Sequence, residues 1–181
     1  MFRIKRIFRT TLLLILTLVT VISTSIISSG EDSIRISRWL VESKLLENGD
    51  LSIVEDITFN ISGKYNGVFR EIVLENTSGI EEIKVVENSE DKILEYKRVE
   101  KAKKGDNNVF LTNEENDRMI LQIFSPSKDE EKTFRVIYTI KNVAKKYKDT
   151  GELYYKFLGR ENDTPIDLFS VNIILPKKDI D

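Results

Sequence analysis

The sequence contains no cysteine and no histidine among its 181 residues. Without histidine, the Ser-His-Asp and Cys-His nucleophile systems are excluded, and so is an imidazole that titrates near neutral pH. Without either residue type, disulfides and the usual zinc, haem and iron–sulfur ligand sets are excluded as well. The formal net charge of −2 gives no basic excess of the kind that nucleic-acid-binding domains carry. We therefore expect no cofactor, no nucleic-acid partner and, at this length, one folded domain.

The first 30 residues have the three parts of a secretory signal. Residues 1–9 hold four cations and no acid, the stretch Thr10–Gly30 has no charge, and small residues precede Glu31. As a helix, the apolar centre Leu12–Ile22 would rise only about 16 Å, short of the ~30 Å hydrocarbon core. We expect residues 1–30 to be a signal peptide cleaved before Glu31, or else an uncleaved N-terminal membrane anchor. Either way, the rest of the chain is expected to be exported.

The exported part, residues 31–181, is more acidic than the whole chain. It holds 24 Lys and Arg against 30 Asp and Glu, a net charge of −6, because the leader contains four cations and no acid. A domain of this size can bury about 68–70% of its unfolded surface, so it can fold without disulfides. We expect residues 31–181 to form one extracytoplasmic domain that contacts the membrane through residues 1–30 if the leader is retained.

Alternating hydrophobic and polar residues predict strands in much of this part. In Leu51–Ile61 the odd positions are hydrophobic except for Glu55, and Phe134–Lys141 alternates in the same way. Further short runs of the same kind are bounded by polar or Gly/Asn/Asp-rich stretches, and Val143–Asp149 is compatible with a helical turn. About nine strands at this spacing predict an all-β fold, an antiparallel immunoglobulin-like β-sandwich. The further runs are Ile80–Glu87, Ile93–Val99, Asn108–Leu111, Met119–Phe124, Leu153–Phe157 and Leu168–Leu175.

One hairpin is strongly indicated by its turn. Asn48 and Gly49 stand between the alternating runs Arg38–Leu46 and Leu51–Ile61, and Asn-Gly in that setting is the strongest short hairpin signal. Just before the hairpin, the alternation changes phase between Ile36 and Trp39, which predicts a β-bulge. We therefore predict an antiparallel hairpin with its turn at Asn48 and Gly49.

Four stretches in this region resemble a known family. They are Gly49, IVED at Ile53–Asp56, FNISGKYNGVFREI at Phe59–Ile72 and ELYYKFLGRENDTPI at Glu152–Ile166. Together they are similar to the N-terminal extracytoplasmic domain of the YciQ-like predicted bacterial membrane proteins, a family of unknown function. The resemblance covers most of Ile34–Pro176 in the same order.

The resemblance implies a signal peptide, a β-rich domain, and then membrane helices with, often, a flexible tail. The sequence departs from it at Tyr155 and Asn162, where the family tends to have tryptophan, and it stops soon after Pro176, where family members continue. Two interpretations follow: a truncated version of a longer membrane protein, or a free-standing version without the anchor. If closing strands are missing, a sheet edge would be exposed.

Glu55 is the most informative carboxylate because it lies in the hydrophobic phase of its strand. An unpaired buried charge is very costly, so we expect Glu55 to be paired or neutralised. Arg70, just beyond the glycine-rich stretch Gly63–Gly67, is its predicted partner. We expect a structural ion pair that pins a hairpin to its neighbour. A bulge that turns Glu55 outward, and a binding or catalytic role, remain as alternatives.

The other candidate sites have simpler structural interpretations. The acidic clusters Glu114–Asp117 and Asp129–Glu131 do not match the calcium-loop pattern and predict solvated turns. Gly63–Gly67 lacks the ending of a phosphate loop and predicts a hairpin turn. Tyr155 and Phe157 share a face at a period of two, which favours the core over an aromatic ligand platform. We therefore predict no catalytic residue and no metal site.

These observations favour a non-enzymatic exported domain that acts as an interaction or sensing module at the cell envelope, with an envelope or membrane protein as its partner. A carboxylate-based enzyme that acts on envelope glycan is the alternative from a different class. A truncated product without a function of its own is the third.

Overall fold

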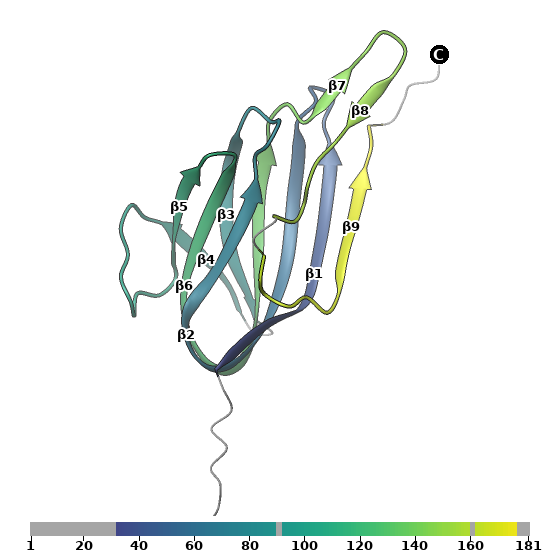
Figure 1. The fold of residues 1–181 in the computed structure, drawn as a ribbon. Helices are drawn as coiled ribbons and strands as arrows, with labels where there is room; N and C mark the ends of the chain where they lie inside the picture. Colours follow the sequence, from purple (N-terminus) through teal and green to yellow (C-terminus); the bar gives the residue numbers. More distant parts are fainter. Residues whose placement is uncertain (1–31, 90–91, 160–161, 177–181) are drawn as a thin grey trace, which may run out of the picture. The chain divides into compact units, whose positions relative to one another are not determined.

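Figure 1 shows a computed structural model, which describes residues 32–89, 92–159 and 162–176. The expected signal peptide or anchor, residues 1–30, lies outside the described residues and stays a prediction. The described part of the chain contains nine strands and no helix, so the prediction of an all-β fold is confirmed. The strands are β1 (Ser33–Leu45), β2 (Leu51–Val73), β3 (Ile80–Ser89), β4 (Lys92–Arg98), β5 (Val109–Glu115), β6 (Arg118–Ile140), β7 (Ala144–Lys146), β8 (Gly151–Leu153) and β9 (Phe169–Ile174).

Seven of these strands form one mixed sheet in the order β3-β4-β5-β6-β2-β1-β9. The pairs β1–β9 and β4–β5 are parallel, whereas the other pairs are antiparallel. β3 also pairs with the second half of β6, while β5 pairs with its first half. β7 and β8 form a separate two-stranded hairpin. The pairing therefore describes one continuous mixed sheet, so the prediction of a purely antiparallel arrangement is wrong. The immunoglobulin-like sandwich stays a prediction.

β1 and β2 form the antiparallel hairpin that the sequence predicts. Their register runs from Ser33 opposite Ser62 to Leu45 opposite Leu51, with a shift between Ile36 and Arg38 where the phase change predicted a bulge. The Leu46 N–H donates to the Asp50 carbonyl at 2.8 Å, which closes the turn. Within that turn, Gly49 has a φ of 86°, a left-handed conformation that glycine adopts at little cost.

The prediction of a hairpin turn at Gly63–Gly67 is wrong, because β2 continues through this stretch to Val73. The register with β6 shifts twice here, between Ile61 and Lys64 and between Tyr65 and Gly67, so the glycines lie in bulges of a bending strand. A Cβ atom on Gly67 would lie 1.8 Å from the Ile123 carbonyl oxygen. Glycine at this position therefore allows the close approach of β2 to β6.

The facing strand differs from its prediction in the same way. The two runs Met119–Phe124 and Phe134–Lys141 belong to the single strand β6, and Asp129–Glu131 lies inside it instead of in a turn. Asp129 has a φ of 49°, so the chain bends there without leaving the sheet. Polar residues interrupt the alternation because this bend is exposed to solvent.

The prediction of a helical turn at Val143–Asp149 is also wrong. Ala144–Lys146 pairs with Gly151–Leu153, and the N–H groups of Val143 and Ala144 both donate to the Gly49 carbonyl, at 2.9 and 3.0 Å. These bonds hold the start of β7 extended against the β1–β2 turn. The strand predicted at Leu153–Phe157 overlaps β8 only at Leu153, where β8 ends.

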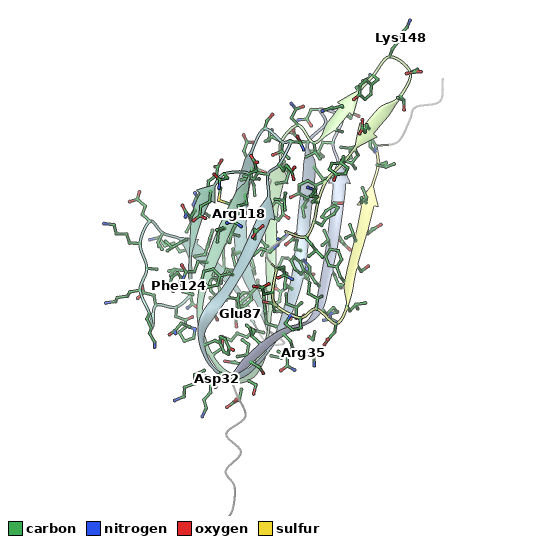
Figure 2. All side chains as sticks on the ribbon, in the orientation of Figure 1. Asp32, Arg35, Glu87, Arg118, Phe124 and Lys148 are labelled. Carbon is green, nitrogen blue, oxygen red and sulfur yellow. The ribbon has the colours of Figure 1, made fainter. Side chains whose placement is uncertain are left out.

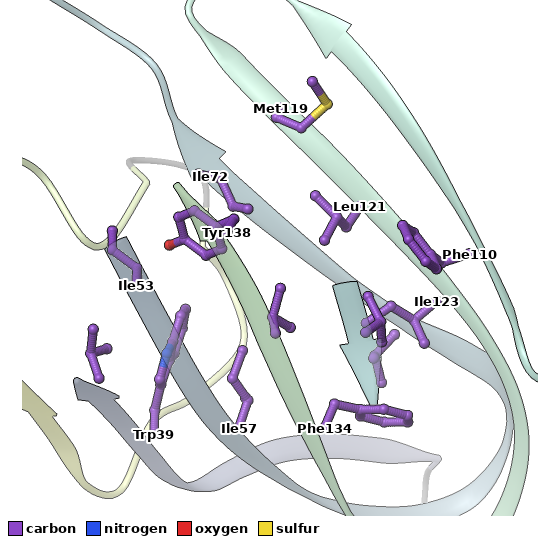
Figure 3. Close-up of a cluster of buried hydrophobic side chains, with 14 of the residues drawn as sticks. Trp39, Ile53, Ile57, Ile72, Phe110, Met119, Leu121, Ile123, Phe134 and Tyr138 are labelled. Atoms are coloured by element: carbon purple, nitrogen blue, oxygen red, sulfur yellow. The ribbon is translucent and has the colours of Figure 1, made fainter. Parts of the chain in front are cut away.

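The core is a cluster of large aliphatic and aromatic side chains, part of which Figure 3 shows around Trp39, Ile57, Phe134 and Tyr138. The Phe134 ring packs edge-on against the rings of Phe59 and Tyr96, with centroids 6.1 and 5.8 Å apart. Every side chain of this cluster, with the partly buried ones packed against it, lies between residues 34 and 171. Residues 31–181 form one compact unit, and this unit holds the whole described core.

Candidate functional site

The structure brings Glu55 and Arg70, the two charged residues that the sequence singles out, together in the interior. Both belong to β2, Glu55 before its bend and Arg70 after it, and their exposed fractions are 0% and 4%. The Arg70 Nε and Nη2 atoms donate to the two carboxylate oxygens at 2.7 and 2.6 Å. This bidentate arrangement is the strongest form of an Arg–carboxylate pair. The bend of β2 thus brings Glu55 and Arg70, which are fifteen positions apart, into contact.

Further hydrogen bonds complete the pair. The Tyr138 hydroxyl from β6 donates to Glu55 Oε1 at 2.6 Å. Arg70 also donates to the carbonyl of Phe157, at 3.0 Å, and to that of Glu71. Its guanidinium carbon lies 4.5 Å from the centroid of the Trp39 ring, within the range of a cation–π contact. The charges are therefore neutralised and hydrogen-bonded, as buried charges must be.

The groups around the carboxylate keep their ordinary protonation states at neutral pH. Burial, together with the charge of Glu55, raises the pKa of Tyr138 well above its usual value, and burial likewise raises the pKa of Tyr155. Burial alone would lower the pKa of Arg70, but the attraction of Glu55 outweighs this effect and raises it. The two tyrosines stay protonated and Arg70 stays charged, so none of the three transfers a proton near neutral pH.

A pocket of about 270 Å³ lies beside this ion pair, and we call it the Trp39 pocket. Trp39 and Phe59 line it from β1 and β2, Arg118 lines it from β6, and Gly159 and Thr164 line it from the segment before β9. Trp39 is only 3% exposed, and its indole Nε1 has no hydrogen-bond partner among the residues that the structure describes. A buried donor without a partner is rare in native proteins.

Two carboxylates, Glu71 and Asp163, are among the residues that line the Trp39 pocket, whereas Glu55 is not. The Glu71 carboxylate pairs with Arg118 at 3.3 Å. It also lies against Gly159, since a Cβ atom there would come within 2.2 Å of Glu71 Oε1. The pocket therefore contains acids, but one of them is engaged by a cation.

The family model described as "Predicted membrane protein (DUF2207) N-terminal domain" matches residues 35–181. The chain belongs to this family. The DUF2207 description is that of a membrane protein, as the resemblance to the YciQ-like proteins implies, although it does not name that group. Within the described residues, no helix has the length and apolar character that a membrane crossing requires.

Other comparisons add little to the DUF2207 assignment. No curated protein matches the chain. The crystal structure of a suspected protease from Parabacteroides distasonis is similar over 60% of this chain and 23% of its own, with 9% identity and a TM-score of 0.36. The chain thus spans less than a quarter of that protein, and so distant a likeness supports no conclusion about fold or function.

A second polar cluster, around Ser125, was not predicted from the sequence. The Lys132 Nζ donates to the Ser125 hydroxyl at 2.8 Å and lies 3.7 Å from the Glu87 carboxylate, to which the Tyr96 hydroxyl also donates. Burial, with this hydrogen bond, raises the pKa of Tyr96. Ser–Lys pairs serve as nucleophile and base in some hydrolases, but Ser125 is 1% exposed. We interpret the cluster as a buried polar network. The bend of β6 brings Ser125 and Lys132 together, and no local sequence pattern predicts that bend.

The acidic clusters considered as cation sites are placed as follows. Asn116 and Asp117 form the turn between β5 and β6, as predicted, while Asp129–Glu131 lies in the bend of β6. Among the described residues, no group of three or more potential ligands could hold a metal ion. The Tyr155–Phe157 pair offers no further site. The rings of that pair stack edge-on, 5.0 Å apart, against the core.

Proposed function

We propose that residues 31–181 are a non-enzymatic interaction or sensing module on the outer side of the cell membrane, and that its ligand or partner binds in the Trp39 pocket. The observation that carries this proposal is the buried indole N–H of Trp39, which has no partner among the described residues. Leaving such a group unpaired costs about 1–3 kcal/mol. A ligand that offers a hydrogen-bond acceptor would recover this cost if its binding shifts the pocket wall and opens this N–H, which is closed to solvent in the unbound structure.

The finer expectations from the sequence belong to the same proposal. The module is part of a YciQ-like membrane protein, and its sheet is an immunoglobulin-like sandwich in which β2 and β6 pass from one layer to the other through their bends. The pairing of β3 and β5 with different halves of β6 supports that layering. Export rests on the leader of residues 1–30.

The buried charges favour binding over catalysis. Glu55 is fixed by Arg70 and Tyr138 and is absent from the residues that line the pocket, so it is not placed to attack or protonate a ligand. The glycan-cleaving alternative depends instead on Glu71 and Asp163, because two carboxylates flanking a bond are what glycoside hydrolysis requires. The ion pair of Glu71 with Arg118 weakens this alternative, because the carboxylate is already engaged by a cation.

Trp39 provides the test, because it is the only tryptophan in the chain. We would titrate residues 31–181 with two probes rich in carbonyl acceptors, the N-acetylglucosamine tetramer and an N-acetylated tripeptide, and follow tryptophan fluorescence. We expect a saturable change with at least one probe and no cleavage of it by mass spectrometry. Thr164→Phe, which fills the pocket, should abolish the change, whereas Thr150→Phe at the exposed β7–β8 turn should leave it intact.

The two remaining outcomes are distinct. Cleavage of the glycan probe that is lost in Glu71→Gln or Asp163→Asn would replace the proposal with the enzymatic alternative. An identical response of wild type and Thr164→Phe to both probes would remove the pocket from the proposal.

A further inference from the structure

At the end of the sheet where β2 and β6 bend, the backbone has positive φ angles and shifts in register. Gly63, with a φ of 89°, and Asp129, with a φ of 49°, lie in the two bulged strands, and the Asp129 carboxylate accepts the Gly63 N–H at 2.7 Å. The register places Lys64 directly opposite Lys128 just beyond this contact. The side chain of Asp32, the first described residue, lies beside Gly63, and Figure 2 shows it at this end of the sheet.

The opposed lysines have an electrostatic cost. Cross-strand partners have their Cβ atoms about 5 Å apart, and like charges directly opposite one another are destabilising. A third cation, Lys104 in the segment between β4 and β5, lines the same hollow of about 520 Å³ as Lys64 and Lys128. The hydroxyl-bearing residues Tyr65 and Ser127 also line it. Three lysines thus line one opening.

No described carboxylate forms an ion pair with any of these three lysines. Glu130 lines the hollow as well, but its carboxylate accepts the backbone N–H of Lys128 at 3.0 Å. Asp129 is likewise bonded to the backbone of Gly63. By contrast, Lys132 and Lys141 each have a carboxylate partner. What distinguishes Lys64, Lys104 and Lys128 from the other lysines without a carboxylate partner is that they line one hollow, where a single anion could contact all three.

We propose that this lysine hollow, formed by Lys64, Lys104 and Lys128, binds phosphate esters. A lysine ammonium is a compact point charge that binds phosphate oxygens. With Glu130 in the same hollow, the three lysines leave a net charge of +2, which balances the charge of roughly −2 on a phosphate monoester or on two neighbouring phosphodiesters. The source is either the headgroup of an anionic phospholipid or a soluble phosphate ester. The family's description as a membrane protein is the reason to include a lipid headgroup among the two sources. This site is independent of the Trp39 pocket.

The test uses residues 31–181, so that the apolar leader cannot bind vesicles itself. Glycerol phosphate is titrated by calorimetry at constant ionic strength, and vesicles of phosphatidylglycerol or phosphatidylcholine are sedimented with the protein. The variant is Lys64→Ser/Lys128→Ser. The matched control is Lys145→Ser/Lys146→Ser, which removes the same charge from β7. The β7–β8 hairpin is far from the lysine hollow, because Figure 2 shows its Lys148 at the opposite end of the domain from Asp32.

We expect wild type and the control to bind glycerol phosphate, phosphatidylglycerol vesicles or both. The Lys64→Ser/Lys128→Ser variant should bind about tenfold more weakly for each lysine removed, because that is the worth of one charge-assisted hydrogen bond. Binding of glycerol phosphate assigns a soluble ester, and binding of the vesicles alone assigns a lipid headgroup. Without ligand, the same variant should melt at a higher temperature than wild type, because the repulsion is gone. Absence of binding to both probes, or equal losses in the two double variants, would overturn the proposal.

Discussion

Replacing Glu55 with glutamine tests how costly it is to leave Arg70 buried without its opposite charge. Glutamine keeps the shape of the side chain but removes the negative charge, so the Arg70 guanidinium, 4% exposed, is left as an uncompensated buried cation. The Glu55 carboxylate accepts three hydrogen bonds, two from Arg70 and one from Tyr138, at 2.6–2.7 Å. Removing one partner of such a pair costs about 3–5 kcal/mol.

That loss is a large share of the roughly 5–15 kcal/mol that stabilises a typical domain. For a domain of this size it corresponds to a fall in Tm of about 6–20 °C. The measurement is urea unfolding of residues 31–181, followed by Trp39 fluorescence and by circular dichroism. Trp39 is suitable because it contacts Arg70 directly.

The neighbouring residue provides the control. Asp56 also pairs with an arginine, Arg135, at 2.7 Å, but on the other face of β2, where the two side chains are 28% and 42% exposed. Asp56→Asn should therefore cost less than about 1 kcal/mol, because surface pairs contribute little. If Glu55→Gln costs no more than Asp56→Asn, the reasoning about burial is refuted.

The remaining predictions concern acid stability, packing and processing. Lys141 donates a hydrogen bond to the Asp50 carboxylate at 2.5 Å, and this bond lowers the pKa of Asp50. The ionised carboxylate therefore stabilises the fold above the unfolded pKa near 3.8. This contribution is lost as the pH falls through the lower pKa of the folded state. Asp50→Asn should therefore be less stable than wild type at pH 7, with the difference shrinking below about pH 4 in acid titrations of unfolding. Gly67→Ala should cost about 1–3 kcal/mol in urea unfolding, because its Cβ would meet a β6 carbonyl, whereas Gly151→Ala, with 3.9 Å of room, should be nearly neutral. Mass spectrometry of the protein secreted by its host should find Glu31 as the first residue, and a retained leader would contradict cleavage.

The β1–β2 hairpin could be predicted because its signals are local. Asn48 and Gly49 stand between two alternating runs, and every residue of that pattern lies within about 30 positions along the chain. The pairing of Glu55 with Arg70 could be predicted for a different reason. A carboxylate in a hydrophobic phase requires a partner, and Arg70 is a nearby arginine just past the glycine-rich stretch that follows it.

The lengths of β2 and β6 could not be predicted, because the features that bend a strand look like those that end it. Gly63 and Gly67 are typical of a turn, and only their contacts with β6 show that the strand continues. The Trp39 pocket was missed for a related reason. Its walls come from segments more than 100 residues apart, such as Trp39 and Thr164, and no local pattern joins them.

The ion pair and the pocket are parts of one structure. Arg70 is held in place from one side by Glu55 and from the other by the Phe157 carbonyl, and its guanidinium lies over the Trp39 ring. The charge that stabilises the bend of β2 therefore also fixes the aromatic wall of the pocket and attaches the segment after β8 to it. A buried ion pair is a weak source of stability compared with well-packed apolar residues. Its position here, between the bend and the pocket, indicates that it contributes to the shape of the Trp39 pocket.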